Sequence, residues 1–361
     1  MKHKTLIAHC EKEYPIYLGT QLLDEADFRK NKLILIMDSN IAKIYENLFV
    51  ESLGLEVLEC LVVPAGEKSK TREMKQSLED QLLAKNYGRD IMLVAIGGGM
   101  ICDLVGFLGA TYCRGVPVVY WPTSLLSMVD ASIGGKTAVN TPYGKNLIGV
   151  FAAPFSVWID ISFLNTLPAN EFANGMAEVI KHALIYDKAF FKQLNKQASG
   201  IGDGKEYLLL DMIERSCEIK NEIVAQDVYD MGVRSILNFG HTIGHAIEIL
   251  EDYRLRHGEA IAIGMLIEAY ISHIKGIADI GLVDTCREIF KLYHLPLKTS
   301  ALQDAHAVLN CLYRDKKNKH QEIHMILLKD VGEVYCDQGF YTHAISEKEI
   351  LTALAWAGEL F

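Results

Sequence analysis

The feature that most constrains the fold is a short apolar run, residues 91–96, that ends in Gly97, Gly98 and Gly99. A short continuous apolar run of this kind is typical of a parallel strand that is buried on both faces. We expect the next helix to begin at Asp103. Glycines between a strand and a helix let backbone N–H groups point at a phosphate. The dinucleotide pattern GxGxxG fails, because Cys102 stands at its last glycine and the usual later acid is missing. The run therefore predicts a variant nucleotide-binding fold.

Other apolar runs extend this prediction to a layer of strands and helices. Residues 32–37, 58–63 and 116–121 each have the pattern of a strand, and a helix is expected from about residue 71 to 86. The first of these strands leads to Asp38. An acid there either binds a ribose hydroxyl, as in dinucleotide-binding sheets, or simply caps the next helix. Strands that alternate with helices up to about residue 165 predict a mostly parallel sheet.

A change of pattern at residues 166–168 marks a domain boundary. We expect an α/β, Rossmann-like domain over residues 1–165 and a mostly α-helical domain over residues 166–361. Within the second domain, Arg234 and Asn238 precede His241 by seven and three residues. They would share its face if the helix had already begun at that point.

Histidines in the second half are the clearest candidates for a metal site. If the segment is helical, His241, His245 and Glu248 lie on one face, and His257 follows after a short break. The three histidines either chelate one metal ion or include a pair of hydrogen-bonded core histidines. Glu178 and Lys181 likewise share a helix face, which suits a functional pair or an exposed ion pair.

A glycine-rich stretch with paired lysines lies between residues 130 and 149. It contains Asp130, Lys136, Lys145 and Asn146. Surface loops have this composition, but so do anion-binding loops, where glycine permits close backbone approach and lysine supplies charge.

Composition narrows the class of protein. The chain has 361 residues, 50% of them hydrophobic, and a formal net charge of −10. This charge disfavours a broad surface for nucleic acid or anionic membrane, although a local cationic pocket remains compatible with it. Eight scattered cysteines without a CxxC motif indicate reduced thiols, and neither an export signal nor a membrane-spanning run is present. We expect a cytoplasmic protein.

Seven segments occur in an order that closely resembles the 3-dehydroquinate synthase family over roughly residues 30 to 335. They are residues 97–107, 114–115, 130–136, 144–149, 177–181, 237–245 and 257–259. The resemblance implies an N-terminal NAD-binding domain, a C-terminal domain for metal and substrate, and an active site in the cleft between them. It also implies a divalent metal, zinc or cobalt, held by Glu178, His241 and His257, whereas His245 is linked to proton transfer.

The resemblance further implies two sets of ligand-binding residues. Those for the substrate and its anionic groups are Arg114, Asp130, Lys136, Asn146, Lys181, Lys220, Arg234, Asn238, His245, Lys316 and Lys317. Those for NAD are Asp38, Gly66, Glu67, Lys70, Gly98, Gly99, Met100, Ile101, Cys102, Asp103, Thr123, Ser124, Asp130, Lys136, Lys145, Phe163, Leu164, Asn165 and Thr166.

The implied reaction belongs to the shikimate pathway, which leads to chorismate and the aromatic amino acids. The substrate, 3-deoxy-D-arabino-heptulosonate 7-phosphate, is oxidised transiently by NAD, loses inorganic phosphate, is reduced again, and then opens and closes by an aldol step to 3-dehydroquinate. The implied partner is thus a small phosphorylated sugar acid, and the implied assembly is a homodimer. The sequence departs from the family's pattern at Cys102, Ser124, His182, Arg256 and residues 227–231.

Three alternatives stay open. One is another sugar-phosphate cyclase, although Lys136, Lys220 and Arg234 match the dehydroquinate version. A second is a metal-dependent polyol dehydrogenase, which has no need for so many phosphate-directed cations. A third is a non-catalytic protein that binds metal or nucleotide.

Overall fold

The computed structural model describes residues 3–26, 28, 31–314 and 322–359. By their internal contacts, these residues form two compact units. The first unit contains Met1–Pro168 and Leu209–Tyr229, and the second contains Ala169–Leu208 and Asp230–Phe361. The single division expected at residue 165 does not anticipate the return of residues 209–229 to the first unit.

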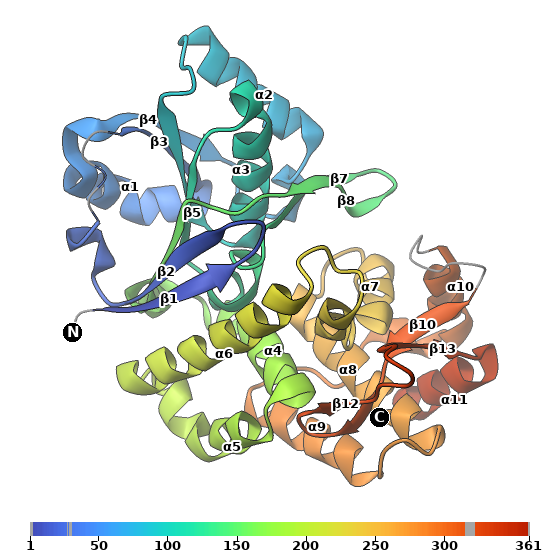
Figure 1. Cartoon of the computed structure of the whole chain (residues 1–361). Coiled ribbons are helices and arrows are strands. Elements are labelled where there is room, and N and C mark those ends of the chain that lie inside the picture. The colour runs from blue at the N-terminus through green and yellow to red at the C-terminus, as the bar shows by residue number, and fades with distance from the viewer. Residues whose placement is uncertain (1–2, 27, 29–30, 315–321, 360–361) are drawn as a thin grey trace. The chain divides into compact units, whose positions relative to one another are not determined.

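A seven-stranded sheet organises the first unit, in the order β1-β2-β9-β6-β5-β3-β4 (Figure 1). Only β1 and β2 pair in antiparallel fashion, and the remaining neighbours are parallel. The strands are β1 (His3–His9), β2 (Glu13–Gly19), β3 (Lys32–Asp38), β4 (Val57–Val63), β5 (Ile91–Gly97), β6 (Val118–Pro122) and β9 (Ser156–Asp160). Each strand predicted from an apolar run is present. The Rossmann-like, mostly parallel layer is confirmed.

Helices connect these strands, as parallel pairing requires. They are α1 (Ser39–Leu53), α2 (Arg72–Ala84) and α3 (Gly99–Thr111), joined from residue 209 onward by α6 (Glu206–Gln226). The expectation that α3 opens at Asp103 was wrong, because the helix begins at Gly99, directly after the glycines. α6 is fixed to the edge strand β1 by Asn221, whose amide donates to the Ile7 carbonyl and accepts from the His9 N–H.

The glycine-rich stretch after residue 130 is a short helical turn followed by a β-hairpin. The hairpin pairs β7 (Lys136–Thr141) with β8 (Gly144–Phe151) and projects from the main sheet (Figure 1). The predicted lysines and Asn146 therefore lie on a hairpin and not on an irregular loop.

The second unit is mostly helical. It contains α4 (Ala169–Tyr186), α5 (Lys188–Gly202), α7 (His241–Leu250), α8 (His257–Ile274), α9 (Gly281–Leu292), α10 (Ala305–Arg314) and α11 (Glu347–Gly358). Small antiparallel pairs are formed by β10 (Ile323–Ile326) with β13 (Thr342–Ile345), and by β11 (Leu328–Asp330) with β12 (Glu333–Val334). The predicted helical character is thus confirmed.

Helix α8 lies at the centre of this unit. Its buried Ile263, Ile267 and Ile271 belong to one apolar core with residues of α7, α10, α11 and β10. A helix that is apolar on nearly all sides must be covered on nearly all sides, which explains why so many elements pack on it. None of the helices that the structure describes is long and apolar enough to cross a membrane.

Arg234 and Asn238 do not lie on the helix that carries His241. They belong to a separate 3-10 helix, Val233–Asn238, and α7 begins only at His241. Gly240, with a φ of 81°, separates the two helices in a left-handed conformation that favours glycine. The condition for a shared face, that the helix has begun before His241, is therefore not met.

Candidate active site

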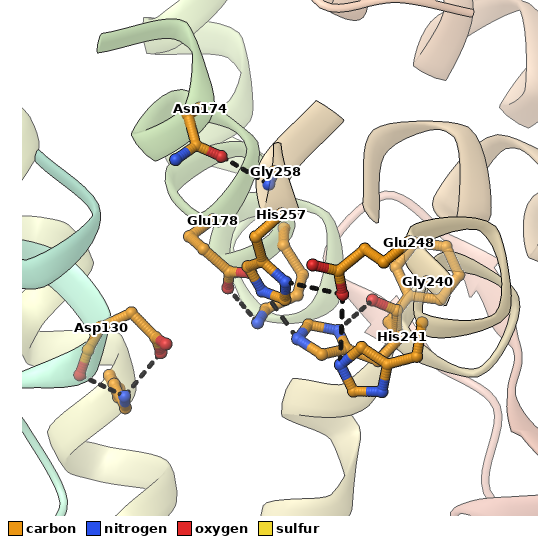
Figure 2. Close-up of polar contacts among 12 residues, drawn as sticks. Asp130, Asn174, Glu178, Gly240, His241, Glu248, His257 and Gly258 are labelled. Carbon is orange, nitrogen blue, oxygen red and sulfur yellow. Dashed lines mark hydrogen bonds and ion pairs between the residues drawn. The ribbon is translucent and has the colours of Figure 1, made fainter. Parts of the chain in front are cut away.

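Three helices of the second unit bring Glu178, His241 and His257 together (Figure 2). Glu178 lies within α4, while His241 and His257 are the first residues of α7 and α8. Their candidate ligand atoms all lie within 4.8 Å of one another. Residues far apart in sequence therefore form one compact group.

Close helix packing makes this convergence possible. A Cβ on Gly264 of α8 would lie 2.0 Å from the Gly240 carbonyl oxygen, and one on Gly258 would lie 2.0 Å from the Asn174 carbonyl oxygen. Any side chain at either glycine would force the helices apart. The side chain of Asn174 also accepts from the Gly258 N–H at 2.6 Å, which ties the start of α8 to α4 (Figure 2).

The Nε2 atoms of both histidines face one carboxylate oxygen. Oε1 of Glu178 lies 3.7 Å from Nε2 of His241 and 3.6 Å from Nε2 of His257. Tetrahedral ligands with bonds of about 2.1 Å lie roughly 3.4 Å from one another, so this spacing suits a metal ion.

The opposite nitrogen of each ring has its own acceptor. Nδ1 of His241 lies 3.3 Å from the Phe239 carbonyl oxygen, and Nδ1 of His257 lies 3.3 Å from Oε2 of Glu248. An Nδ1–H that donates to these acceptors leaves the Nε2 lone pair available for a cation. Both rings are therefore oriented as metal ligands usually are.

Glu178 is fully buried, and its two oxygens differ. One forms an ion pair with Lys181, whereas Oε1 makes no hydrogen bond within the described part of the chain. Burial by itself raises the pKa of Glu178, but Lys181 and His257 outweigh it and hold that pKa below its usual range. Since buried carboxylate oxygens are nearly always satisfied, the ionised Oε1 fits a divalent cation.

The histidines have opposite protonation tendencies. Burial, together with the charge of Lys181 and the neighbouring histidines, lowers the pKa of His241 well below its ordinary value. Burial also opposes a charge on His257, but Glu178 and Glu248 raise its pKa to about 9. Without a metal, a proton on His257 therefore balances the two carboxylates.

A second group of possible ligands shares His257. His245, Glu248 and His257 also offer ligand atoms within 4.8 Å of one another. Nε2 of His245 lies 4.0 Å from Oε2 of Glu248, and its ring centroid lies 5.2 Å from that of His241. The geometry brings all three histidines together, and the ligand set implied by the family, which excludes His245, stays a prediction.

The start of α7 is held by a buried acid that the sequence analysis did not single out. Glu268 of α8 accepts from the backbone N–H groups of Gly240 at 2.7 Å and Ile243 at 3.5 Å. Burial raises the pKa of Glu268 to about 8, despite these backbone donors. Glu268 thereby anchors the turn that presents His241.

In the first unit, predicted NAD residues gather at the carboxyl ends of neighbouring strands. The N–H of Thr123, after β6, donates to the Gly97 carbonyl of β5 at 2.9 Å, and Ser124 Oγ would lie 3.5 Å from a Cβ on Gly98. Gly98 precedes α3, and no described side chain caps that helix. Open helix amides beside glycines fit a phosphate of a dinucleotide, and this edge is where such sheets bind ligands.

Of the two roles considered for Asp38, the structure shows the helix cap, and the ribose contact stays a prediction. Its Oδ1 accepts from the N–H groups of Asn40 and Ile41, which caps α1. Its Oδ2 points the other way and would lie 3.0 Å from a Cβ on Gly97. The cap is thus present, and the second oxygen faces the glycine turn where a ribose hydroxyl is expected.

Two ion pairs in the first unit join other predicted residues. Nζ of Lys220 lies 2.5 Å from both the carbonyl oxygen and Oδ1 of Asp130. Lys70 is buried, pairs with Asp103, and donates to Oδ1 of Asn146 at 2.5 Å. Burial opposes the charge on Lys70, but Asp103 and Glu67 raise its pKa above the ordinary value.

The other predicted residues are dispersed or undescribed. Arg114 is exposed beyond the C-terminal end of α3, about 20 Å from the glycines at the other end of that helix. On the hairpin, Lys136 is exposed and Lys145 is half-buried. Among the residues that follow β9, Phe163 and Leu164 are buried, whereas Asn165 and Thr166 are exposed. Arg234 is buried. Lys316 and Lys317 lie outside the described residues.

The structure also reveals residues that no sequence motif signalled. Asn174 and Glu268 position the helices that bear the histidines, and Asn140 connects the hairpin with residues 67–70. Their partners are distant in sequence, so periodicity provided no signal for them. Glu248 was placed on the correct helix face, but its contact with His257 was not predicted.

Sequence comparison identifies relatives along most of the chain. The family profile described as 3-dehydroquinate synthase N-terminal matches residues 60–174, and the profile described as 3-dehydroquinate synthase C-terminal matches residues 175–318. A 3-dehydroquinate synthase of Shewanella loihica is 41% identical over 335 residues, covering 90% of this chain and 93% of the relative. One from Thermodesulfovibrio yellowstonii is 40% identical over 306 residues, covering 84% and 85%.

Solved structures show the same fold. A 2-deoxy-scyllo-inosose synthase, crystallised with carbaglucose-6-phosphate, NAD+ and Co2+, matches with a TM-score of 0.89 and 25% identity, covering 98% of this chain and 99% of the other. A 2-epi-5-epi-valiolone synthase from Streptomyces hygroscopicus, with bound NAD+ and Zn2+, matches with a TM-score of 0.88 and 25% identity over 99% of each chain. A glycerol dehydrogenase from Schizosaccharomyces pombe, at 14% identity, 95% and 88% coverage and a TM-score of 0.68, shares the fold alone.

Proposed function

The chain belongs to the 3-dehydroquinate synthase family, and we propose the set of residues through which it performs the reaction of that family. The enzyme is a lyase of the shikimate pathway that converts 3-deoxy-D-arabino-heptulosonate 7-phosphate to 3-dehydroquinate and inorganic phosphate. Its cofactors are NAD and a divalent metal ion. The observation that best supports this function is the buried Oε1 of Glu178, which faces the Nε2 atoms of two histidines.

We assign the metal to Glu178, His241 and His257 in the second unit. Three protein ligands leave coordination positions for a substrate, as catalytic metal sites require. When bound, the metal polarises a substrate oxygen and NAD exchanges a hydride with the adjoining carbon. His245, beside both ligand rings, then moves a proton without holding the metal.

NAD is assigned to the first unit. The open N-terminus of α3, at Gly98 and Gly99, binds its pyrophosphate, and Oδ2 of Asp38 accepts from a ribose hydroxyl. Cys102 is compatible with this arrangement, because it is buried within α3 and burial raises the pKa of its thiol. It acts as a small apolar residue there, and the amides before it do the binding.

Cationic residues receive the anionic groups of the substrate. Lys181, Lys220 and Arg234 are buried, and the first two pair with Glu178 and Asp130. Arg234 offers a planar guanidinium suited to a phosphate or carboxylate, whereas lysines act as point charges. Their carboxylate partners hold the two lysine side chains in place until substrate binds. Homodimer assembly stays a prediction of the family resemblance, and a cytoplasmic location stays a prediction from the sequence pattern.

A phosphate-release assay tests the function. Purified protein with NAD and zinc or cobalt should release inorganic phosphate from the heptulosonate phosphate without net accumulation of NADH. A chelator should abolish release, and added metal should restore it. Failure of a metal-replete sample to release phosphate would contradict the function.

The rival functions give different results in the same experiment. Net NADH from a non-phosphorylated alcohol would identify a polyol dehydrogenase. Turnover of a different sugar phosphate in place of the heptulosonate would identify another cyclase. Bound metal and NAD without turnover would identify a binding protein.

A further inference from the structure

Two segments of the first unit that are assigned to different ligands are joined through Asn140, beside a direct contact from Lys70 to Asn146. Residues 66–70, with the 3-10 helix Glu67–Ser69, belong to the proposed NAD site. Asn146, on the hairpin strand β8, belongs to the proposed substrate site. Asn140 of β7 lies between them and was assigned to neither ligand.

Each polar group of Asn140 has a distinct partner. Its Nδ2 donates to Oε1 of Glu67 at 2.6 Å, and its Oδ1 accepts from the backbone N–H of Asn146 at 3.0 Å. Its backbone N–H donates to the Lys70 carbonyl at 2.8 Å. Since one end of the amide faces an acceptor and the other a donor, only one amide orientation satisfies both contacts.

Lys70 closes these contacts into a ring. Its Nζ donates to Oδ1 of Asn146 at 2.5 Å, and the same nitrogen pairs with Asp103 of α3. The ring therefore runs from Glu67 to Asn140, Asn146 and Lys70, and back to Glu67 through the short 3-10 helix. Both ends of Asn146, its N–H and its side chain, are held by this ring.

The ring holds Asn146 in an unusual conformation. Its φ is 54°, in the left-handed region that costs energy for a residue other than glycine. Asn146 is also exposed at the surface, so core packing does not impose this conformation. The contacts to Asn140 and Lys70 hold its backbone N–H and its side chain in this conformation, which asparagine tolerates better than most residues.

We propose that Asn140 is a positioning residue that keeps the cofactor residue Glu67 and the substrate residue Asn146 in register. This inference extends the proposed function and rests on it, because the proposed function assigns NAD and the substrate to these two segments. Loss of the Asn140 amide should weaken both binding steps, because each ring member is oriented through the others. The two halves of the amide also separate the effects: Nδ2 serves the NAD side, and Oδ1 serves the hairpin.

Three variants separate the two halves. Asn140→Asp keeps the acceptor for the Asn146 N–H but places a carboxylate against Glu67. Asn140→Ala removes both contacts. Asn140→Asp combined with Glu67→Gln restores a donor–acceptor pair with the amide on the opposite side. Asn31→Asp is the matched control, since the Asn31 amide in the same unit donates to a backbone carbonyl, that of Phe28, and to no other group among the described residues.

Calorimetric titration with NAD tests the contact between Nδ2 of Asn140 and Glu67 without requiring turnover. We expect Asn140→Asp to weaken NAD binding roughly tenfold, as loss of a hydrogen bond to a charged group does. The double variant should bind NAD within about threefold of Glu67→Gln alone, by the same estimate. Unchanged binding in Asn140→Asp, or a double variant that binds NAD at least about tenfold more weakly than Glu67→Gln alone, would overturn the proposed role of the Asn140–Glu67 contact.

Hydrogen exchange tests the contact between Oδ1 of Asn140 and the Asn146 N–H, and it requires no ligand. The Asn146 amide should lose protection in Asn140→Ala and keep it in Asn140→Asp and Asn31→Asp. Equal protection in all variants would overturn the proposal. With the heptulosonate phosphate, the KM should rise roughly tenfold for Asn140→Ala and less for Asn140→Asp. If the wild type has no turnover, the proposed function fails, while the exchange result still decides the role of Asn140.

Discussion

The two units each contain a buried lysine–carboxylate pair, but the pairs differ in what they leave unsatisfied. In the first unit, Lys70 and Asp103 interact with each other, and Asn146 completes the contacts of the lysine. In the second, Lys181 satisfies one oxygen of Glu178 and leaves Oε1 facing the Nε2 atoms of two histidines. In the first cluster, the charge of Lys70 is satisfied by groups of the protein. In the second cluster, a carboxylate oxygen and two imidazole nitrogens face one another, and a bound cation would satisfy them.

This difference teaches how to distinguish a cluster that binds a metal ion from one that does not in the same molecule. Each cluster pairs a buried lysine with a carboxylate, Asp103 partly exposed and Glu178 fully buried, so an ion pair by itself does not identify the metal site. The orientation of lone pairs does, because a buried carboxylate oxygen and two imidazole nitrogens that face one another repel unless a proton or metal lies between them. Substitutions in the second cluster should therefore change metal binding and the stability that metal provides. Substitutions in the first cluster should have the same effect on stability with and without metal.

The largest effect is expected at the metal ligands. His241→Ala or His257→Ala should lower metal affinity more than a hundredfold and remove the stabilisation that metal gives to the folded chain. His245→Ala should retain metal and lose rate. Metal content by elemental analysis and thermal melting with and without zinc check this, and equal metal loss in all three variants would refute the ligand assignment.

The next effect tests the cluster of the first unit. Asp103→Ala removes the nearest carboxylate from buried Lys70 and leaves Glu67, at 4.0 Å, as a more distant one, which should lower the free energy of unfolding by about 3 kcal/mol. The loss should be the same with metal and with chelator. Asp103→Asn, which keeps an acceptor, should lose less. Denaturant unfolding measures both, and a loss that depends on metal would contradict the comparison.

A pH effect follows from Glu268. Its folded pKa of about 8 lies above the ordinary value of 4.5, so between these values the folded state holds a proton that the unfolded state has released. The contribution of Glu268 to stability is therefore greatest at low pH and is lost as pH rises toward 8. Compared with Glu268→Gln, the wild type should lose roughly 3 kcal/mol of stability from pH 5 to 8. Parallel stability curves for both proteins would rule this out.

The smallest effect concerns the acceptor behind His257. Glu248→Ala removes the partner of Nδ1, and loss of such a partner lowers metal affinity by about tenfold. Glu248→Gln keeps an acceptor oxygen and should recover most of the affinity. Competition with a metal-binding dye measures both. If Glu248 were itself a ligand, as the grouping of His245, Glu248 and His257 permits, Glu248→Gln would fail to recover it.

Much of the first unit was predictable from sequence. The apolar runs became β3, β4, β5 and β6, because a buried parallel strand must be apolar on both faces. The start of α3 was misplaced, since three glycines gave no propensity signal for a helix at Gly99. The hairpin of residues 136–151 was also missed as a hairpin, because its lysines and glycines suit a loop equally well.

The candidate site was predictable only in part. Spacing placed His241, His245 and Glu248 on one helix face, and the structure places His245 close to His241. The choice of Glu178 as the acid came from family resemblance, since no periodicity connects α4 with α7. The contacts of Asn140, Asn174 and Glu268 could not be predicted, because each partner lies on a different element.

By itself, the sequence determined the order of strands and helices, the glycine turn after β5, and the residue types available for a metal and a dinucleotide. These properties follow from local patterns of apolar residues, glycines and charges. Only the tertiary structure decided which of those residues meet. Gly258 and Gly264 let α8 approach α4 and α7 closely, and the acceptors Phe239 and Glu248 orient the two rings. The convergence on Glu178 depends on packing between helices, which no local pattern contains.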